Sequence, residues 1–132
     1  MMLSISDIKD LLKQNFPQYN YYLGTIDKSK NNSIGIYLRT ASDSNIAIGG
    51  KKNTLYSVLP VTILFRGTED AQETIENANK IYEFLHGLTN VTVNGKNISG
   101  IICLDSSPID LSRDELNICE LVIRIFVYYN KT

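Results

Sequence analysis

The feature that most restricts the fold is a long alternation of side chains near the C-terminal end. From Leu116 to Tyr129, apolar residues at every second position alternate with a mixed set of polar and apolar residues. Side chains of a β-strand point to opposite faces with a period of two, so the pattern predicts one long strand with an apolar and a mixed face. An apolar strand face has to be covered by another layer. We therefore expect a sheet with a second layer packed on it.

Two segments have the apolar spacing of amphipathic helices. Ser4 to Asp7 has the form of a capping box, and apolar residues then follow at helical spacing until Pro17. A second helix is expected to start near Thr68 and to end at His86-Gly87, because glycine suits a left-handed C-cap. The apolar face predicted for this second helix consists of Ala71, Ile75, Ala78, Tyr82 and Leu85.

Five further strands are predicted, at residues 19–26, 33–38, 54–66, 91–93 and 97–104. The first two flank a polar stretch and are interpreted as a hairpin. The last two form a second hairpin, because Asn94-Gly95 fits the positive-φ positions of a tight turn. Pro60 lies inside the strand at 54–66, so we expect either a bulge or a stretch of sheet edge there. Residues 105–115 are interpreted as a polar loop.

The order of these elements predicts an α+β fold. We expect a mainly antiparallel, mixed sheet of about five to six strands with the two helices packed on one face. A chain of 132 residues has the size of one domain, and no linker or repeat divides it, so residues 1–132 are predicted to form a single domain. Residues 40–53 are small and polar and are expected to form a mobile loop or hairpin tip.

The charge balance disfavours stable binding to nucleic acid or to a membrane. The chain has 13 basic and 14 acidic residues and hence no cationic surplus to neutralise phosphates. Polar and charged residues follow the first residues too early for a signal peptide, and no apolar run approaches the length of a membrane span. We therefore expect the chain to stay in the cytoplasm unless an assembly carries it out.

The residues that could support catalysis do not form a recognisable set. A base and nucleophile pair would have to use His86, the single histidine, and its place before the C-cap glycine already has a structural explanation. The run Gly49-Gly50-Lys51-Lys52 lacks a glycine at Asn45 and a serine or threonine at Lys52, both of which a phosphate-binding loop requires. No catalytic, cofactor-binding or metal-ligating residue is assigned, and the chain is predicted not to be an enzyme.

Both cysteines lie inside apolar segments that are predicted to be strands. In a reducing compartment, Cys103 and Cys119 are expected to act as small buried hydrophobic residues, with a disulfide as the alternative. A zinc site would need two more ligands.

Four carboxylates lie in the predicted polar loop at residues 105–115, and they are Asp105, Asp110, Asp114 and Glu115. Three interpretations remain open, which are a solvated loop, a contact with another protein and a site for a hard cation. Their spacing fits no calcium-loop pattern.

The aromatic content suggests contact with other subunits. The chain has eight tyrosines and four phenylalanines, and adjacent pairs such as Tyr21-Tyr22 and Tyr128-Tyr129 place rings on both faces of predicted strands. One core does not easily accommodate this much aromatic surface, which favours burial against partner subunits.

Three stretches resemble those of a known protein family. They are residues 59–67, which end in Arg66-Gly67, residues 78–88 with their Leu-x-Gly ending, and residues 108–115, which end in Arg113-Asp114-Glu115. In this order they resemble the tail terminator or minor capsid proteins of long-tailed bacteriophages, over roughly the last two-thirds of the chain. Ser112 stands where the family's loop has glycine.

The resemblance implies a structural protein of the virion, made in the cytoplasm of a bacterial host. Such proteins form a ring, commonly hexameric, at the head-proximal end of the tail tube. There the ring stops tube growth and provides the surface on which the head docks. The implied partners are further copies of the chain, the tail tube protein and a head-completion or connector protein, with DNA only passing through the channel. The alternative function is a small cytosolic binding or regulatory module.

Five residues are candidates for the contact between subunits, and they are Arg66, Gly67, Arg113, Asp114 and Glu115. They end two of the stretches that carry the resemblance. Three consecutive charged residues at 113–115 cannot all point into one core, so some of them must meet water or another chain.

Overall fold

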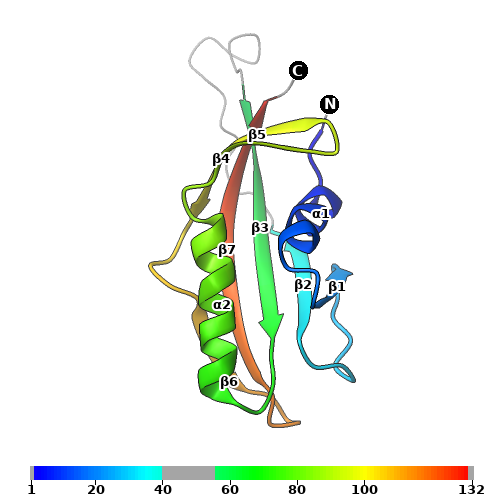
Figure 1. Ribbon diagram of the computed structural model, residues 1–132, viewed down its shortest axis with the longest axis vertical. Helices are drawn as coiled ribbons and strands as arrows, with labels where there is room; N and C mark the ends of the chain where they lie inside the picture. Colours follow the sequence, from blue (N-terminus) through cyan, green and yellow to red (C-terminus); the bar gives the residue numbers. More distant parts are fainter. Residues whose placement is uncertain (1, 40–55, 131–132) are drawn as a thin grey trace.

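The computed structural model describes residues 2–39 and 56–130 (Figure 1), so the loop or hairpin tip expected at 40–53 lies outside the described residues. The helices are α1 (Ile5–Asn15) and α2 (Ala71–Leu85), and the strands are β1 (Asn20–Leu23), β2 (Ser33–Leu38), β3 (Tyr56–Arg66), β4 (Thr89–Val93), β5 (Lys96–Cys103), β6 (Ile109–Arg113) and β7 (Cys119–Asn130). The predicted α+β class is confirmed.

All described strands belong to one mixed sheet. Its order is β1-β2-β3-β7-β5-β4, and β6 pairs with β7 beside β5. Every pairing is antiparallel except that of β1 with β2. The long C-terminal strand predicted from the alternation is β7, which pairs with β3 from Tyr56↔Asn130 to Arg66↔Glu120. Buried and more exposed residues alternate along its whole length, as the pattern predicts.

The hairpin predicted for the first two strands is wrong, because β1 and β2 run parallel. Their register begins at Asn20↔Ser33 and ends at Leu23↔Ile36. After β1 the chain turns at Gly24, with φ of 70°, and returns to the starting end of β1 before β2 begins. The polar composition of this connection indicates a turn but does not say to which end of the strand the chain returns. A parallel pair requires such a crossover.

Pro60 lies within β3 and does not form a bulge. The register of β3 with β7 has no shift at this position, whereas the register with β2 ends at Val61. The carbonyl of Pro60 accepts a hydrogen bond from the backbone N–H of Arg39 at 3.0 Å. Of the two predicted alternatives, a bulge or a stretch of sheet edge, the described residues show the sheet edge at Pro60. An edge position suits proline because it has no backbone N–H to donate.

The predicted polar loop at 105–115 contains a strand that the sequence did not reveal. This strand, β6, pairs with β7 at Ile109↔Val122 and Asp110↔Leu121, and its register then shifts. Four of its five residues are exposed, so it lacks the apolar alternation by which strands are recognised. The hairpin of β4 and β5 is confirmed, with φ of 52° at Asn94 and 75° at Gly95.

Both helices form where their spacing predicts them, but α2 differs in detail. Its N-cap is Asp70 instead of Thr68, and the Asp70 carboxylate accepts a hydrogen bond from the N–H of Glu73 at 3.1 Å. The predicted end at His86-Gly87 is confirmed, with φ of 80° at Gly87. The buried residues of α2 are Thr74, Ala78, Ile81 and Leu85. Ile75, which was expected on this face, is 39% exposed.

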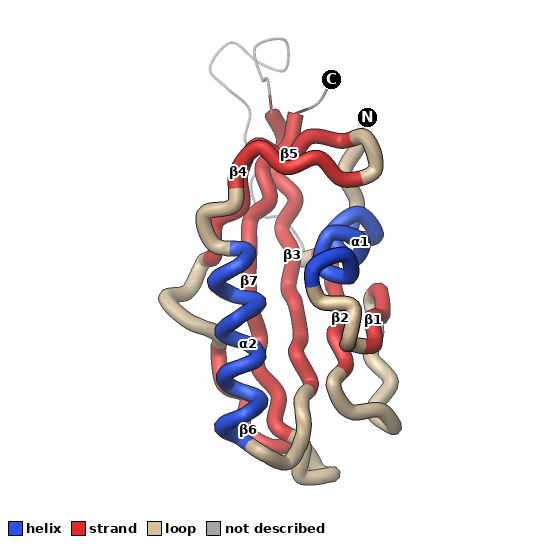
Figure 2. The backbone as a smooth tube through the Cα atoms, viewed as in Figure 1, coloured by secondary structure: helices blue, strands red, loops and turns tan. Residues whose placement is uncertain are grey.

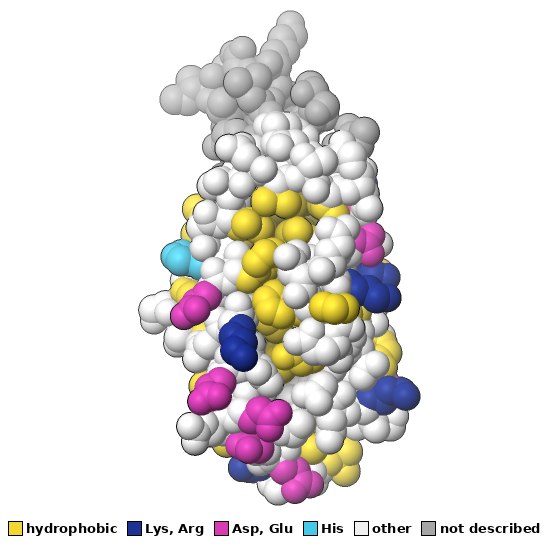
Figure 3. All heavy atoms as spheres, viewed as in Figure 1, with side chains coloured by type: hydrophobic (Ala, Val, Ile, Leu, Met, Phe, Trp, Pro, Cys, Tyr) yellow, Lys and Arg dark blue, Asp and Glu magenta, His cyan; other side chains and the backbone are white. Residues whose placement is uncertain are grey.

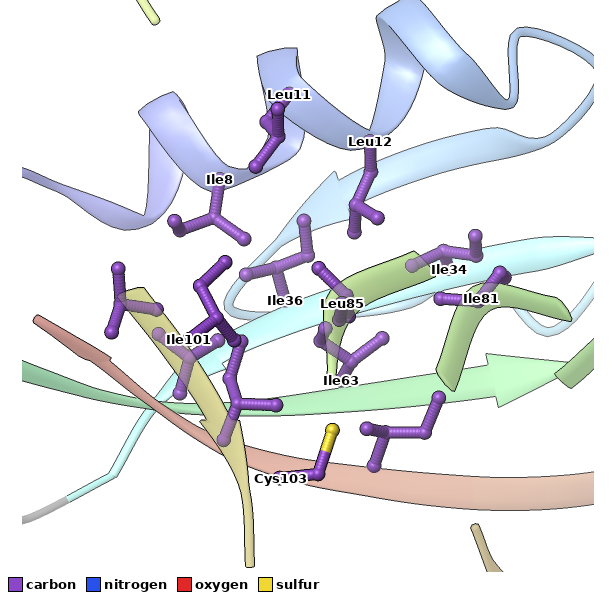
Figure 4. Close-up of a cluster of buried hydrophobic side chains, with 14 of the residues drawn as sticks. Ile8, Leu11, Leu12, Ile34, Ile36, Ile63, Ile81, Leu85, Ile101 and Cys103 are labelled. Atoms are coloured by element: carbon purple, nitrogen blue, oxygen red, sulfur yellow. The ribbon is translucent and has the colours of Figure 1, made fainter. Parts of the chain in front are cut away.

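Apolar side chains of both helices enter one buried cluster with the sheet. Ile8 and Leu12 of α1 meet Ile81 of α2 in this cluster, together with Ile36 of β2 and Ile63 of β3 (Figure 4). Helix α1 lies beside β1 and β2, and α2 lies beside β7 (Figure 2). Within the described part of the chain, neither helix is long and apolar enough to cross a membrane.

Candidate subunit interface

Two of the three stretches that carry the family resemblance, residues 59–67 and 108–115, meet at one end of the sheet. Strand β3 ends there, α2 begins there, and the turn between β6 and β7 lies beside them (Figure 1). The N–H of Gly67 donates to the carbonyl of Cys119 at 3.0 Å, and the N–H of Cys119 donates to the carbonyl of Thr68, also at 3.0 Å. These bonds extend the β3–β7 ladder past the end of β3.

Arg66 is buried completely inside the subunit, with 0% exposure. Its Nη1 donates to the carboxylate of Asp114 and, at 3.2 Å, to that of Glu120, and its Nη2 donates to the carbonyl of Lys28 at 3.0 Å. Its Nε has no hydrogen-bond partner among the described residues. A buried guanidinium needs such partners, because an uncompensated buried charge is strongly destabilising. Arg66 therefore joins β3 to the β6–β7 turn and to the β1–β2 connection.

Asp114 organises the β6–β7 turn. Its Oδ1 accepts hydrogen bonds from the N–H of Leu116 at 2.9 Å and of Ile118 at 3.0 Å. Its carbonyl accepts from the N–H of Asn117, which has φ of 66°. The hydrogen bond from Arg66 is the main cause that lowers the pKa of Asp114 below its usual value. The carboxylate thus fixes the turn from inside the loop.

Gly67 is buried and has no room for a side chain. A Cβ atom at this position would lie 2.4 Å from both Cγ2 and Oγ1 of Thr74. The Thr74 hydroxyl in turn accepts from the N–H of Thr68 at 3.1 Å and donates to the carbonyl of Asp70 at 2.8 Å. Glycine here lets the start of α2 approach the end of β3, so Gly67 has a packing role within the subunit.

The exposed members of the candidate set are Arg113 and Glu115. Nη1 of Arg113 donates to the carbonyl of Glu69 at 2.8 Å and to that of Asn117 at 3.0 Å, which ties the turn to the segment before α2. Glu115 makes no ion pair with any described residue. Leu116 beside it is 55% exposed. The structure therefore brings all five candidates to one end but places only two of them in exposed positions.

Ser112 adopts the backbone conformation that glycine tolerates best. Its φ is 67°, in the left-handed region, and its N–H donates to the Asp110 carboxylate at 2.7 Å. The family resemblance implies glycine at this position. The loop thus keeps a glycine-like conformation although its residue is serine.

Three of the four carboxylates of the predicted polar loop serve separate local contacts. Asp105 forms a bidentate pair with Arg124, with distances of 2.9 Å to Nε and 2.7 Å to Nη2. Asp114 pairs with Arg66, and Asp110 accepts from the N–H of Ser112. Within residues 2–39 and 56–130, no group of three or more His, Cys, Asp or Glu residues is arranged to hold a metal ion.

His86 and both cysteines have local structural contacts. The His86 Nδ1 accepts from the N–H of Cys103 at 3.4 Å, and its ring stacks on Tyr82. Cys103 and Cys119 are free and buried, which confirms the preferred interpretation, and burial raises the pKa of the Cys103 thiol to about 11. The Gly49–Lys52 run lies outside the described residues.

Two surface features could not be located from the sequence. The first is a groove of about 420 Å³ between α2 and β6, lined in part by Ala71, Ile75, Asp110, Arg113 and Leu121. The sequence could have indicated this groove only through Ile75, but the helical spacing assigned Ile75 to the buried face of the helix.

The second feature is the face of the sheet that points away from the buried cluster. Its residues include the half-buried Val58, Leu64, Val122 and Phe126. Ile102, which pairs with Phe126, is 49% exposed, and Leu104 is 38% exposed. The guanidinium of Arg39 lies 5.3 Å from the centre of the Phe126 ring.

The comparison with known proteins agrees with the resemblance. A family model described as bacteriophage tail terminator protein matches residues 3–130. No curated protein matches the chain. The proteins of this family are structural components of the virion tail and not enzymes. Because the match spans nearly the whole sequence, this chain belongs to the bacteriophage tail terminator family.

Proposed function

We propose that the chain forms a ring, most simply a hexamer, at the head-proximal end of the tail tube. The ring stops tube growth and offers the surface on which the head docks. Its partners are further copies of the chain, the tail tube protein and a head-completion or connector protein, and no membrane is involved. The observation that carries this proposal is the family match over residues 3–130.

The β6–β7 turn suits a contact between subunits because its conformation is fixed before assembly. Arg66 and Asp114 hold the turn from inside, and Arg113 ties it to the segment before α2. A surface that is already ordered loses less conformational entropy when it binds. In this proposal Arg113 and Glu115 touch the neighbouring subunit or the tube, while Arg66, Gly67 and Asp114 position them.

The charge of the chain suits a ring through which DNA passes. With 13 basic and 14 acidic residues, the subunit has a net charge of −1 and no cationic surplus to hold phosphates. The subunit would be made in the cytoplasm of the bacterial host and leave the cell within the virion. Catalysis has no part in this role.

Tube termination can be tested with the purified chain and tail tubes of the same phage. We expect light scattering to show the chain as a monomer or weak oligomer alone and as a bound ring on tubes. Electron microscopy should show tubes of uniform length with the chain and overlong tubes without it. A chain that never associates with tubes would contradict the proposal.

The turn itself can be tested with Glu115→Ala. Glu115 makes no ion pair within the described subunit, so the substitution should change the free energy of unfolding by no more than about 0.5 kcal/mol. The variant should nevertheless bind tubes less well and leave some of them overlong. The matched control is Ser106→Ala at another exposed loop position, which should terminate tubes normally. If Glu115→Ala terminates tubes normally, this turn is not part of the contact.

A further inference from the structure

The subunit has two different flanks, which lie toward opposite edges of the sheet. The α2 flank consists of residues 69–86 with the adjoining groove between α2 and β6. The α1 flank consists of residues 9–30, which include most of α1, the edge strand β1 and the connection after it. The sheet order places β1 at one edge and β6 on the far side of β7, and Figure 1 shows α1 and α2 on opposite sides of the molecule.

The two flanks carry opposite charge. Residues 69–86 contain five acidic residues and one lysine, a net charge of −4. Residues 9–30 contain four lysines and two aspartates, a net charge of +2. Acidic side chains gather over the α2 side in Figure 3, and dark-blue side chains border the α1 side. The lysines of the α1 flank make no ion pair with any described residue, and they are Lys9, Lys13, Lys28 and Lys30.

The acidic residues of the α2 flank are also without ion-pair partners among the described residues. Glu76 and Glu83 are exposed on α2, and neither has an ion pair. One subunit therefore presents two surfaces of opposite charge, and no ion pair within the described residues neutralises the lysines of one or the acidic residues of the other.

Each flank also presents apolar surface. On the α2 flank, Ile75 is 39% exposed and lines the groove of about 420 Å³ together with Ala71 and Leu121. On the α1 flank, Leu23 is 40% exposed at the end of β1, an edge strand that pairs only with β2 among the described strands. Stable interfaces need an apolar centre with a polar rim, and each flank offers both.

We propose that the α2 flank of one subunit binds the α1 flank of a second copy of this chain. Contacts between two different, complementary patches are heterologous, and they close into a ring when the rotation between neighbours allows it. The opposite charges would orient the copies during encounter and disfavour contacts between two like flanks. This pairing rests on the proposed ring and specifies which surfaces form it.

The proposal can be tested with two charge-reversed variants. The first, E73K/E76K/E83K, changes the net charge of the α2 flank from −4 to +2, and the second, K9E/K13E, changes that of the α1 flank from +2 to −2. In each variant alone the two flanks have like charge, so we expect at least about tenfold weaker assembly on tubes at low ionic strength. An equimolar mixture should recover assembly, because the altered α2 flank of one variant then meets the altered α1 flank of the other, and the two unaltered flanks likewise meet each other with opposite charge.

Two controls make the result specific. The chain that carries all five substitutions should assemble by itself, since its flanks are again opposite in sign. Lys80→Glu adds negative charge to the same α2 flank and should assemble at least as well as the unmodified chain. Thermal midpoints are measured first, and K28E/K30E in the connection after β1 replaces K9E/K13E if α1 does not tolerate the change.

The outcomes separate this inference from the proposed function. If the unmodified chain terminates tubes and each charge-reversed variant does so equally well, the flank pairing is wrong and the ring remains. If the variants fail and neither the mixture nor the chain with all five substitutions recovers assembly, the flank pairing is also wrong. If the unmodified chain does not bind tubes at all, the proposed function is wrong. Recovery that weakens with added salt supports the electrostatic contact.

Discussion

The guanidinium of Arg66 connects three segments that are distant in sequence. It reaches Asp114 and Glu120 beside the β6–β7 turn and the carbonyl of Lys28 before β2. The resemblance drew attention to this residue as a surface candidate, yet its exposure is 0%. The sequence could not show this burial, because a charged residue at the end of a strand is usually exposed. Burial became possible only when the fold brought two carboxylates to it.

Replacing this guanidinium should destabilise the subunit strongly. We expect Arg66→Met to lower the free energy of unfolding by about 3 kcal/mol or more, because the carboxylates of Asp114 and Glu120 would lose their shared partner. Denaturant unfolding at neutral pH measures the effect. The control is Arg124→Met, which breaks the more exposed pair with Asp105 and should change stability little. Equal losses in both variants would contradict the role assigned to Arg66.

Asp114 should make stability depend on pH in the acidic range. The hydrogen bond from Arg66 holds the pKa of Asp114 below its usual value, so the folded state binds a proton less readily than the unfolded state. The stabilisation is fully present above the unfolded pKa of about 3.9 and is lost as pH falls through the folded pKa. The difference in unfolding free energy between the unmodified chain and Asp114→Asn should therefore shrink as pH falls. A difference that stays constant down to acidic pH would contradict this assignment.

Ser112 offers a substitution that should stabilise the protein. Its φ of 67° is strained for an L-residue, so Ser112→Gly should raise the free energy of unfolding by about 0.5–1 kcal/mol. Ser106 is exposed in the preceding loop and has no positive φ, so Ser106→Gly should not stabilise. Thermal unfolding of both variants distinguishes the cases. A loss of stability in Ser112→Gly would show that the serine side chain has a role of its own.

At the scale of elements, periodicity predicted the strands and helices that bury one face. The alternation at 116–129 predicted β7, and helical spacing predicted α1 and α2. The same method missed β6, whose residues are mostly exposed, and it made β1 and β2 a hairpin although they are parallel. In both cases backbone hydrogen bonds to a neighbouring strand decide the structure, and these bonds cannot be predicted from the polarity of the side chains.

The junction between β3 and α2 should tolerate no side chain at Gly67. A Cβ atom there would lie 2.4 Å from the side chain of Thr74, so we expect Gly67→Ala to displace the start of α2 and to cost about 1–3 kcal/mol. The matched control is Gly100→Ala in β5, where the nearest atom to a Cβ would be 3.7 Å away. Thermal unfolding should separate the two variants clearly. If Gly67→Ala is as stable as the control, the close approach is not a constraint.

At the scale of the whole molecule, the important features come from residues that the fold brings together. The α2–β6 groove combines residues near position 71 with residues near 121, and the two charged flanks become opposite only once α1 and α2 are placed on the sheet. The sequence predicted surplus aromatic surface and a turn at 113–115 that must meet water or another chain. It could not place either of them relative to the helices, because that placement depends on strand order.

The sheet face that points away from the buried cluster provides the last prediction. Ile102 and Leu104 are 49% and 38% exposed on this face, next to the half-buried Phe126. Because they are already so exposed in the subunit, Ile102→Gln with Leu104→Gln should change its stability by no more than about 1 kcal/mol. An apolar face of this kind favours burial in an assembly, so the double variant should bind tubes more weakly. Leu38→Gln, which is 61% exposed on the side of Ile34 and Ile36, serves as the control and should bind normally. If the double variant and the control terminate tubes equally well, this sheet face remains in solvent in the finished tail.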